Sequence, residues 1–387
     1  MEIEDFRHVR HFPGTEGNPF DRWLRVLEDL QKLPAVIFLL ILFLICWFPL
    51  HREPAKALFL FVFFSSDWLS LSLLPRFKRS FGPPRPTTLL LALFRLPFAF
   101  LPSPFYLIFQ LIGSLLVFYG FWIEPHRLTL TRETLATPKL PANFSLRLLH
   151  LGDLHVERIT QREIRLNELI QNLQPDLILF SGDILNLSYL EDPQAIQDAI
   201  QVISEWRAPL GVFLVSGSEA VDLAHVIPPL IDRTGHTWLD NQVVTLDHQG
   251  ASFDLIGITC SHRPFVDAPI LEHLIRDLPD RFRILLYHSP DLAPNAAKMG
   301  VDLQLSGHTH GGQIRLPWIG ALYTASLYGR KFQSGRYRLD SMTLYITRGI
   351  GLEGKAAPRV RFLCPPEIIL WEITGKPKTS NTRLETP

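Results

Sequence analysis

Cysteine is scarce in this chain of 387 residues. It occurs three times, at Cys46, Cys260 and Cys364, and no two of these residues form a CxxC pair. A small disulfide framework needs an even set of cysteines, and a zinc knuckle needs closely spaced thiolates. The sequence therefore argues against both kinds of site, and three separate thiols suit a reducing compartment.

An excess of charge of one sign is also missing. The chain has 38 Lys+Arg and 38 Asp+Glu, so its formal net charge is +0. Proteins that bind nucleic acid present a basic patch that neutralises phosphates. The balanced charge gives no support for such a partner, and we expect no specific nucleic-acid binding.

Hydrophobic residues, in contrast, make up 47% of the chain, and many lie in four runs near the N-terminus. The runs are residues 33–50, 57–74, 88–101 and 104–123. A helix that spans a bilayer needs about 20 mostly apolar residues, and the first, second and fourth runs reach or nearly reach that length. The third run is shorter and contains Arg95 and Pro97, so it either spans with a tilt or dips into the membrane and returns. We therefore expect a transmembrane region of about four helices at 33–123.

Basic residues flank these runs unevenly. They are frequent before the first run, between the second and third runs and after the fourth, and the turn between the third and fourth runs has none. With four spans, the positive-inside rule places both termini in the cytoplasm. We therefore predict a multi-pass protein of the inner cell membrane with a cytoplasmic C-terminal region, whereas three spans would place that region outside.

Residues 1–32 are predicted to form a cytoplasmic or interfacial segment. One face of a helix at 20–33 would carry four apolar residues, Phe20, Trp23, Leu24 and Leu27. Such a face is typical of a helix that lies in the membrane interface. An ordinary cytosolic helix is the alternative interpretation.

Two charged residues, Asp67 and Arg95, lie near the middle of apolar runs. A charge at that depth in a membrane is costly unless it has a partner. We therefore predict that Asp67 and Arg95 pair with each other.

The pattern changes after the fourth run. Residues 124–143 are polar and contain several prolines, which is typical of a linker. Between 144 and 375, short apolar runs such as 176–180 alternate with amphipathic stretches such as 160–174. This alternation predicts a layered α/β domain at 144–375. Residues 376–387 are predicted to be a disordered tail.

Polar side chains follow several of the apolar runs that we expect to be strands. They are Asp153, His155, Asp183, His288, His308 and His310. Each residue alone is more often a turn residue or a helix cap. Ligand sites in α/β sheets, however, lie beyond the carboxyl ends of the strands, and imidazole with carboxylate and no thiolate suits Mn, Fe or Zn. The joint pattern therefore predicts a metal site.

The remaining histidines lack this setting. His150 alternates to the opposite face of its strand and is predicted to be part of the core. The others are His225, His236, His248, His262 and His273, and we do not expect them to be ligands.

Four motifs, GDLH, SGDIL, YHSPD and GHTHGGQ, occur in this order. The set resembles the calcineurin-like metallophosphoesterases, and the segments IEPHRLTL and YITRGIGLEG resemble their membrane-anchored bacterial branch. The resemblance implies a four-layer α/β/β/α sandwich with two divalent metal ions. It also implies that Asp153, His155, Asp183 and His310 surround the first ion. Asp183 would bridge to the second ion, and His288 and His308 would hold it.

The chain departs from this family at its third motif, G-N-H-[DE]. In its place the sequence reads Gly217, Ser218, Glu219 and Ala220. Ser218 replaces an Asn ligand of the second ion, so we expect a weaker second site. Glu219 replaces the His that contacts the phosphate, and it is either a general acid, a substitute ligand or a cap of the following helix.

The resemblance implies a membrane-anchored, metal-dependent hydrolase of a phosphate ester or pyrophosphate. Because the site would lie near membrane lipids, we expect an amphipathic and lipid-linked substrate. One alternative is a metal-binding but catalytically weakened sensor or scaffold, because of the altered third motif. Another is a channel or carrier, although the pair of broken helices typical of transporters is missing. Retention of all six ligands favours the hydrolase, and the sequence does not determine the oligomeric state.

One aromatic stretch near the C-terminal end of the predicted site has two interpretations. It contains Trp318, Leu322, Tyr323 and Tyr328. These side chains either line a groove for an acyl chain or pack against the edge of the sandwich, and the sequence alone favours the second.

Overall fold

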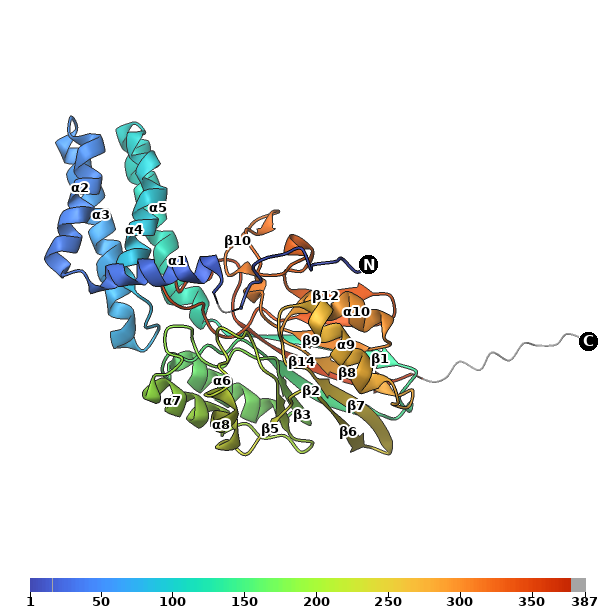
Figure 1. Cartoon of the computed structure of the whole chain (residues 1–387). Coiled ribbons are helices and arrows are strands. Elements are labelled where there is room, and N and C mark those ends of the chain that lie inside the picture. The colour runs from blue at the N-terminus through green and yellow to red at the C-terminus, as the bar shows by residue number, and fades with distance from the viewer. Residues whose placement is uncertain (16, 377–387) are drawn as a thin grey trace, which may run out of the picture.

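A computed structural model describes residues 1–15 and 17–376 of the chain. A group of helices formed by the N-terminal third stands on one side of a larger α/β domain (Figure 1). The predicted disordered tail lies, apart from Lys376, outside the described residues.

Four α-helices occupy the segment for which we predicted a transmembrane region (Figure 1). They are α2 (Ala35–Leu50), α3 (Pro54–Leu73), α4 (Pro84–Arg95) and α5 (Ser103–Phe118). Among the described residues, two helical segments are long and apolar enough to cross a membrane, Pro54–Phe77 and Ser103–His126. A third candidate is the pair Arg22–Lys32 and Ala35–Leu50, which is bent by 110°. The helix α4 has 12 residues, too few for a span by itself.

The outer surface of this helix group is apolar. Val36, Phe48 and Phe94 are 78%, 69% and 70% exposed, and Phe38 and Leu60 are buried between the helices. Contiguous exposed apolar surface of this extent is unfavourable in water and is the surface that a bilayer requires.

The predicted pair inside the helix group is confirmed. Arg95 donates a hydrogen bond from Nη1 to Oδ2 of Asp67, and the two residues are 7% and 4% exposed. The guanidinium also donates from Nε to Oε1 of Gln110, at 3.1 Å, and from Nη2 to the backbone carbonyl of Gln110, at 2.7 Å. A Cβ atom on Gly113 would lie 2.5 Å from Nε of Arg95, so this glycine makes room for the buried guanidinium.

The helix α1 (Pro19–Glu28) lies across the base of the helix group (Figure 1). Trp23 and Leu27 are exposed, whereas Leu24 is buried against Ala356 and Ala357 of the α/β domain. The apolar residues predicted to share one face are thus divided between the surface and the domain. The side chain of the fourth, Phe20, lies outside the described residues.

Two mixed six-stranded sheets form the centre of the α/β domain. The first has the order β1 (Thr129–Thr137), β14 (Glu367–Gly375), β2 (Ser145–Leu151), β3 (Leu177–Phe180), β4 (Val212–Leu214) and β5 (Thr237–Trp238). The second has the order β12 (Gly335–Leu339), β13 (Met342–Ile346), β9 (Leu303–Ser306), β8 (Phe282–Leu286), β7 (Ala251–Gly257) and β6 (Gln242–His248). A hairpin of β10 (Arg315–Leu316) and β11 (Gly320–Ala321) projects from the domain (Figure 1).

The strands alternate their side chains between two cores, as strand geometry requires. In β2, Leu148 packs in one core with Leu286 and Leu305 of the second sheet, and Leu149 and Leu151 face the other way. The first sheet is covered by α6 (Gln161–Leu173), α7 (Pro193–Ile203) and α8 (Ile227–Asp232). The second sheet is covered by α9 (Pro264–Ile275) and α10 (Ala293–Lys298). The layers are therefore α/β/β/α, which confirms the predicted fold.

The predicted linker at 124–143 is wrong, because its middle part, Thr129–Thr137, is a strand of the first sheet. Residues of β1 pair in parallel with β14, from Thr129 with Glu367 to Thr137 with Gly375. Pro125, Pro138 and Pro141 suggested a linker, but they lie outside this strand and bracket it. An edge strand is half exposed, so Thr-rich polar sequence forms it readily.

Candidate metal centre

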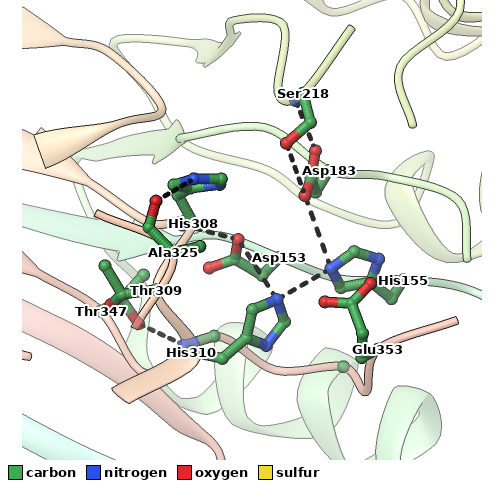
Figure 2. Close-up of polar contacts among 12 residues, drawn as sticks. Asp153, His155, Asp183, Ser218, His308, Thr309, His310, Ala325, Thr347 and Glu353 are labelled. Atoms are coloured by element: carbon green, nitrogen blue, oxygen red, sulfur yellow. Dashed lines mark hydrogen bonds and ion pairs between the residues drawn. The ribbon is translucent and has the colours of Figure 1, made fainter. Parts of the chain in front are cut away.

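All six predicted ligands meet at one edge of the two sheets, and Figure 2 labels all of them except His288. The first sheet contributes Asp153 and His155 after β2 and Asp183 after β3. The second sheet contributes the remaining three, His288 after β8 and His308 and His310 after β9. All six residues are buried. The parallel β2 and β3, and the parallel β8 and β9, bring their carboxyl ends to this edge.

Asp153, His155, Asp183 and His310 form the first group, in which one ligand atom of each lies within 4.8 Å of the others. Nε2 of His155 lies 3.0 Å from Nε2 of His310 and 3.6 Å from Oδ2 of Asp183. Nε2 of His310 lies 3.8 Å from Oδ1 of Asp153. Figure 2 shows these side chains pointing toward one another.

The second group shares Asp183 with the first. Nε2 of His288 lies 3.4 Å from Oδ2 of Asp183. Ser218 follows β4, and its Oγ lies 3.2 Å from Nε2 of His288 and 3.4 Å from Oδ2 of Asp183. The structure thus brings Ser218 to the place expected for the altered third motif.

The donor atoms fit divalent metal ions. Three of the histidines place one ring nitrogen against a backbone carbonyl. Nδ1 of His155 lies 3.3 Å from the carbonyl of Leu185, and Nδ1 of His288 lies 2.7 Å from that of Ser181. Nε2 of His308 lies 3.2 Å from the carbonyl of Ala325. This second contact fixes the tautomer of a metal-binding histidine and leaves its other nitrogen for the ion. Buried Oδ2 of Asp153 and Nδ1 of His310 have no hydrogen-bond partner among the described residues.

Metal binding needs neutral imidazole and ionised carboxylate. His310 and Asp183 already favour these states, whereas burial raises the pKa of Asp153 to about 6. Burial, reinforced by His155, lowers the pKa of His310 well below its ordinary value. Burial alone would raise the pKa of Asp183, but His288, His155 and a backbone N–H hold it below its usual range. Burial would lower the pKa of His288, but Asp183 raises it to about 9, so a metal ion must displace a proton there.

The ligand loops adopt an unusual backbone conformation. Asp153, His155, Asp183, His308 and His310 have φ angles of 49°, 46°, 63°, 71° and 51°. Non-glycine residues adopt this left-handed region at a cost of about 1–3 kcal/mol each, and such residues cluster at functional sites. The loops also need close backbone contacts, because a Cβ atom on Gly217 would lie 2.0 Å from Oδ1 of Asp183.

Asp222 is a supporting residue that the sequence did not reveal. Its Oδ2 accepts hydrogen bonds from the backbone N–H groups of Asp183, at 2.8 Å, and Gly217, at 2.7 Å. Its Oδ1 accepts from the N–H of Ile184 at 2.9 Å. One buried carboxylate therefore holds the two loops that carry Asp183 and Ser218. In the sequence it was one acidic residue at the start of an expected helix.

Glu219 is not brought to the centre. Its side chain is 46% exposed and lies 3.7 Å from Nη1 of Arg263. It lines a surface cavity with Leu223 and Pro228, separate from the pocket beside Ser218. Its predicted part in catalysis therefore has no geometric support.

His262, which we did not expect to be a ligand, lies beside two of the predicted ligands. It is 1% exposed, and its ring lies 4.3 Å from that of His308 and 5.7 Å from that of His288. The ligand atoms of these three histidines lie within 4.8 Å of one another, so His262, His288 and His308 together could hold a metal ion. His150, in contrast, is buried in the core as predicted, with Nε2 at 3.2 Å from Oγ of Ser181.

Comparison with known proteins agrees with this geometry. Residues 146–312 match the model of the calcineurin-like phosphoesterase family. The chain is 32% identical over 263 residues to the uncharacterised metallophosphoesterase YkuE of Bacillus subtilis, over 66% of this chain and 88% of the relative. The protein belongs to the calcineurin-like phosphoesterase family. It is therefore a metal-dependent phosphoric ester hydrolase, and membership favours this reading over a scaffold or a carrier.

Two further family members have more specific names. The phosphodiesterase YaeI of Escherichia coli is 28% identical, over 66% of this chain and 92% of its own length. The UDP-2,3-diacylglucosamine pyrophosphatase LpxG of Chlamydia trachomatis is 24% identical, over the same shares of the two chains.

Proposed function

We propose that the protein is a membrane-anchored hydrolase with two divalent metal ions that cleaves a lipid-linked phosphate ester or pyrophosphate. The observation that carries the proposal is the convergence of six buried carboxylate and imidazole side chains beside a pocket, in a domain attached to apolar helices. The Chlamydia trachomatis relative is a pyrophosphatase of a diacylated substrate, which supports the lipid-linked class.

Asp153, His155, Asp183 and His310 would hold one ion, and Asp183, His288 and His308 the other, with Mn, Fe or Zn as the expected metals. Two such ions supply Lewis acidity toward a phosphoryl oxygen and a nucleophile from water at neutral pH. The side chains of the protein fix this arrangement beforehand, because the second-nitrogen contacts and Asp222 hold the ligands in place.

The pocket beside the centre has a volume of about 100 Å³. Asp183, Ser218 and His308 line its inner side, and Glu353 and Tyr323 line its walls. A pocket of this size admits a phosphate group and leaves the rest of a large substrate outside.

The N-terminal segment supplies the remaining wall of this pocket and connects it to the membrane region. Pro13, Gly14 and Asn18 line the pocket, and the carbonyl of Gly14 accepts a hydrogen bond from the N–H of Ala220 at 3.0 Å. The chain then continues directly into α1 and α2. This proximity supports a substrate that reaches the site from the bilayer.

We also propose that α2 to α5 cross the inner membrane four times. Four passes place the domain on the side where the N-terminus lies, and the flanking basic residues favour the cytoplasm. The short α4 is extended by a 3-10 helix, Leu96–Phe100, before α5 begins.

An apolar tip, residues 318–323, supports a membrane-facing site. Trp318, Leu322 and Tyr323 are 103%, 56% and 62% exposed, so the predicted packing against the sandwich edge is wrong for them, and only Tyr328 of that set is buried. In Figure 1 the β10 hairpin projects toward the same side as α2 to α5. Exposed Trp and Tyr are favoured at the membrane interface. We infer that this tip contacts the bilayer.

The substrate class is tested by the rates of the purified protein in detergent on matched compounds. UDP-2,3-diacylglucosamine is compared with UDP-glucosamine without acyl chains and with bis-p-nitrophenyl phosphate. We expect the highest kcat/KM on the diacylated compound. Preference for the short soluble diester over every lipid ester would overturn the lipid-linked class and leave the hydrolase intact.

If the tip contacts the bilayer, changing it should affect the hydrolysis of a lipid ester but not that of a soluble diester. The double substitution Trp318→Ser and Leu322→Ser should lower kcat/KM on a lipid ester in vesicles about tenfold, because two apolar side chains no longer enter the bilayer. The rate on bis-p-nitrophenyl phosphate should stay the same. Ile164→Ser removes a side chain that is also 52% exposed, on α6, and serves as the control. Equal losses on both substrates, or none, would contradict the contact.

A further inference from the structure

His262 comes from the strand next to those that carry two of the expected ligands. The strands β9, β8 and β7 are adjacent and parallel in the second sheet. The loops after them carry His308, His288 and His262 respectively. Three neighbouring strands therefore deliver three imidazoles to the same edge.

The ring of His262 is buried without a hydrogen bond. The residue is 1% exposed, and neither Nδ1 nor Nε2 has a partner among the described residues. A buried donor or acceptor left without a partner costs about 1–3 kcal/mol. If the ring only filled space against His308, an apolar ring would do so at a lower cost. The polar ring therefore indicates a bound group that would interact with one of its nitrogen atoms.

Its position coincides with the gap left by the altered third motif. One ring nitrogen of His262 lies within 4.8 Å of ligand nitrogens of both His288 and His308. A Cβ atom built on Gly14 would lie 2.6 Å from Nε2 of His262 and 2.8 Å from Oγ of Ser218. These two atoms thus face the same point, beside the residue that stands where the family has its Asn ligand.

The backbone of His262 resembles that of the ligands. Its φ is 59°, within the range of the five ligands with positive φ. Histidine at such an angle is strained, and the surrounding structure must hold it there. Strain of this kind concentrates at functional positions.

We propose that His262 is a ligand of the second metal ion and takes the place of the Asn that Ser218 has replaced. The proposal rests on the two-metal centre proposed above. The second ion is then held by Asp183, His262, His288 and His308. Three imidazoles and one carboxylate favour Zn or Fe over Mn, which prefers oxygen ligands. Ser218 supplies a hydrogen bond to the ligands rather than a strong bond to the metal.

The test measures metal binding by the full-length protein in detergent after removal of metals with a chelator. Cobalt(II) is added in steps, its visible absorption is followed, and bound metal is counted by elemental analysis. Wild type should bind two ions per chain. His262→Phe, which keeps an aromatic ring against His308, should bind one ion tightly and the second at least about 100-fold more weakly.

Two further variants make the result specific. His225→Phe changes a histidine whose side chain is 67% exposed, far more than that of His262, and should still bind two ions. Adding Ser218→Asn to His262→Phe supplies an amide ligand and should restore the second ion. Thermal unfolding of each metal-free variant verifies that the fold is kept.

The outcomes separate this inference from the proposed function. Two ions bound by His262→Phe with wild-type affinity would overturn the role of His262 and leave the two-metal hydrolase standing. Fewer than two ions bound by wild type would overturn the two-metal centre and the role of His262 together.

Discussion

Replacing Asp183 with asparagine should lower kcat/KM on bis-p-nitrophenyl phosphate by at least about a thousandfold, or about 4 kcal/mol of transition-state stabilisation. Asp183 lies between the two ligand groups, because its Oδ2 is 3.6 Å from Nε2 of His155 and 3.4 Å from Nε2 of His288. Asparagine keeps the shape of the side chain, and its oxygen can still accept the N–H of Ser218, which lies 2.7 Å from Oδ1. The loss therefore reports the missing charge at the centre.

A second buried aspartate provides the control for this variant. Asp198 on α7 is 7% exposed and accepts a hydrogen bond from the N–H of Ile159 at 3.1 Å, away from the centre. Asp198→Asn should keep kcat/KM within about twofold, since exchanges away from the reacting groups change only stability. If Asp183→Asn retained more than a tenth of the wild-type value, the bridging role of Asp183 would be wrong.

Breaking the buried pair in the helix group should have the largest effect on stability. Asp67→Ala or Arg95→Ala should each lower the free energy of unfolding by about 3–5 kcal/mol, because each leaves a buried charge without its partner. The double substitution should cost less than either single one, since no uncompensated charge remains. Equilibrium unfolding in mixed detergent micelles measures all three values.

An exposed ion pair gives the matched comparison. Nζ of Lys32 lies 2.6 Å from Oδ1 of Asp29, and these side chains are 82% and 66% exposed. Asp29→Ala should change the free energy of unfolding by less than about 1 kcal/mol. The prediction would be wrong if the double substitution at Asp67 and Arg95 lowered the free energy of unfolding by the sum of the two single losses. In that case the two side chains would not stabilise each other.

The sequence was sufficient for the features that depend on repeated local pattern. Mostly apolar runs such as 176–180 predicted the central strands, because a strand buried on both faces has few polar positions. The convergence of the six candidate ligands also followed from sequence, since each of them lies within four residues of the end of such a strand. Parallel strands end at the same edge of a sheet, so residues that follow them lie close together. This can be predicted without knowing how the loops fold.

The features missed depend on pairing between distant segments. The strand β1 has a half-polar sequence, and its partner β14 lies more than 200 residues later in the chain. His262 lies only five residues beyond the end of its strand at Gly257, but the sequence of that loop does not reveal that the ring turns toward the site. Its burial depends on Gly14 and His308, which come from opposite ends of the chain. Local pattern carries no information on such contacts.

The altered third motif illustrates the same limit. In sequence, Ser218 was expected to be a weaker ligand of the second ion, and Glu219 was either a site residue or a helix cap. In the structure, the side chain of Ser218 turns toward His288, and that of Glu219 turns toward Arg263 at the surface. Glu219 lies in a turn in which the N–H of Val221 donates to the carbonyl of Ser218, and the conformation of this loop decides which side chain faces the metal centre.

The central claim is that the converging carboxylates and imidazoles bind a pair of divalent ions on which hydrolysis depends. The most direct measurement is the rate of bis-p-nitrophenyl phosphate hydrolysis by metal-free protein as zinc or manganese is added in known equivalents. We predict no turnover without metal and a rate that rises until two equivalents per chain are bound. Full turnover by the metal-free protein, or a rate that is maximal at one equivalent, would contradict the account.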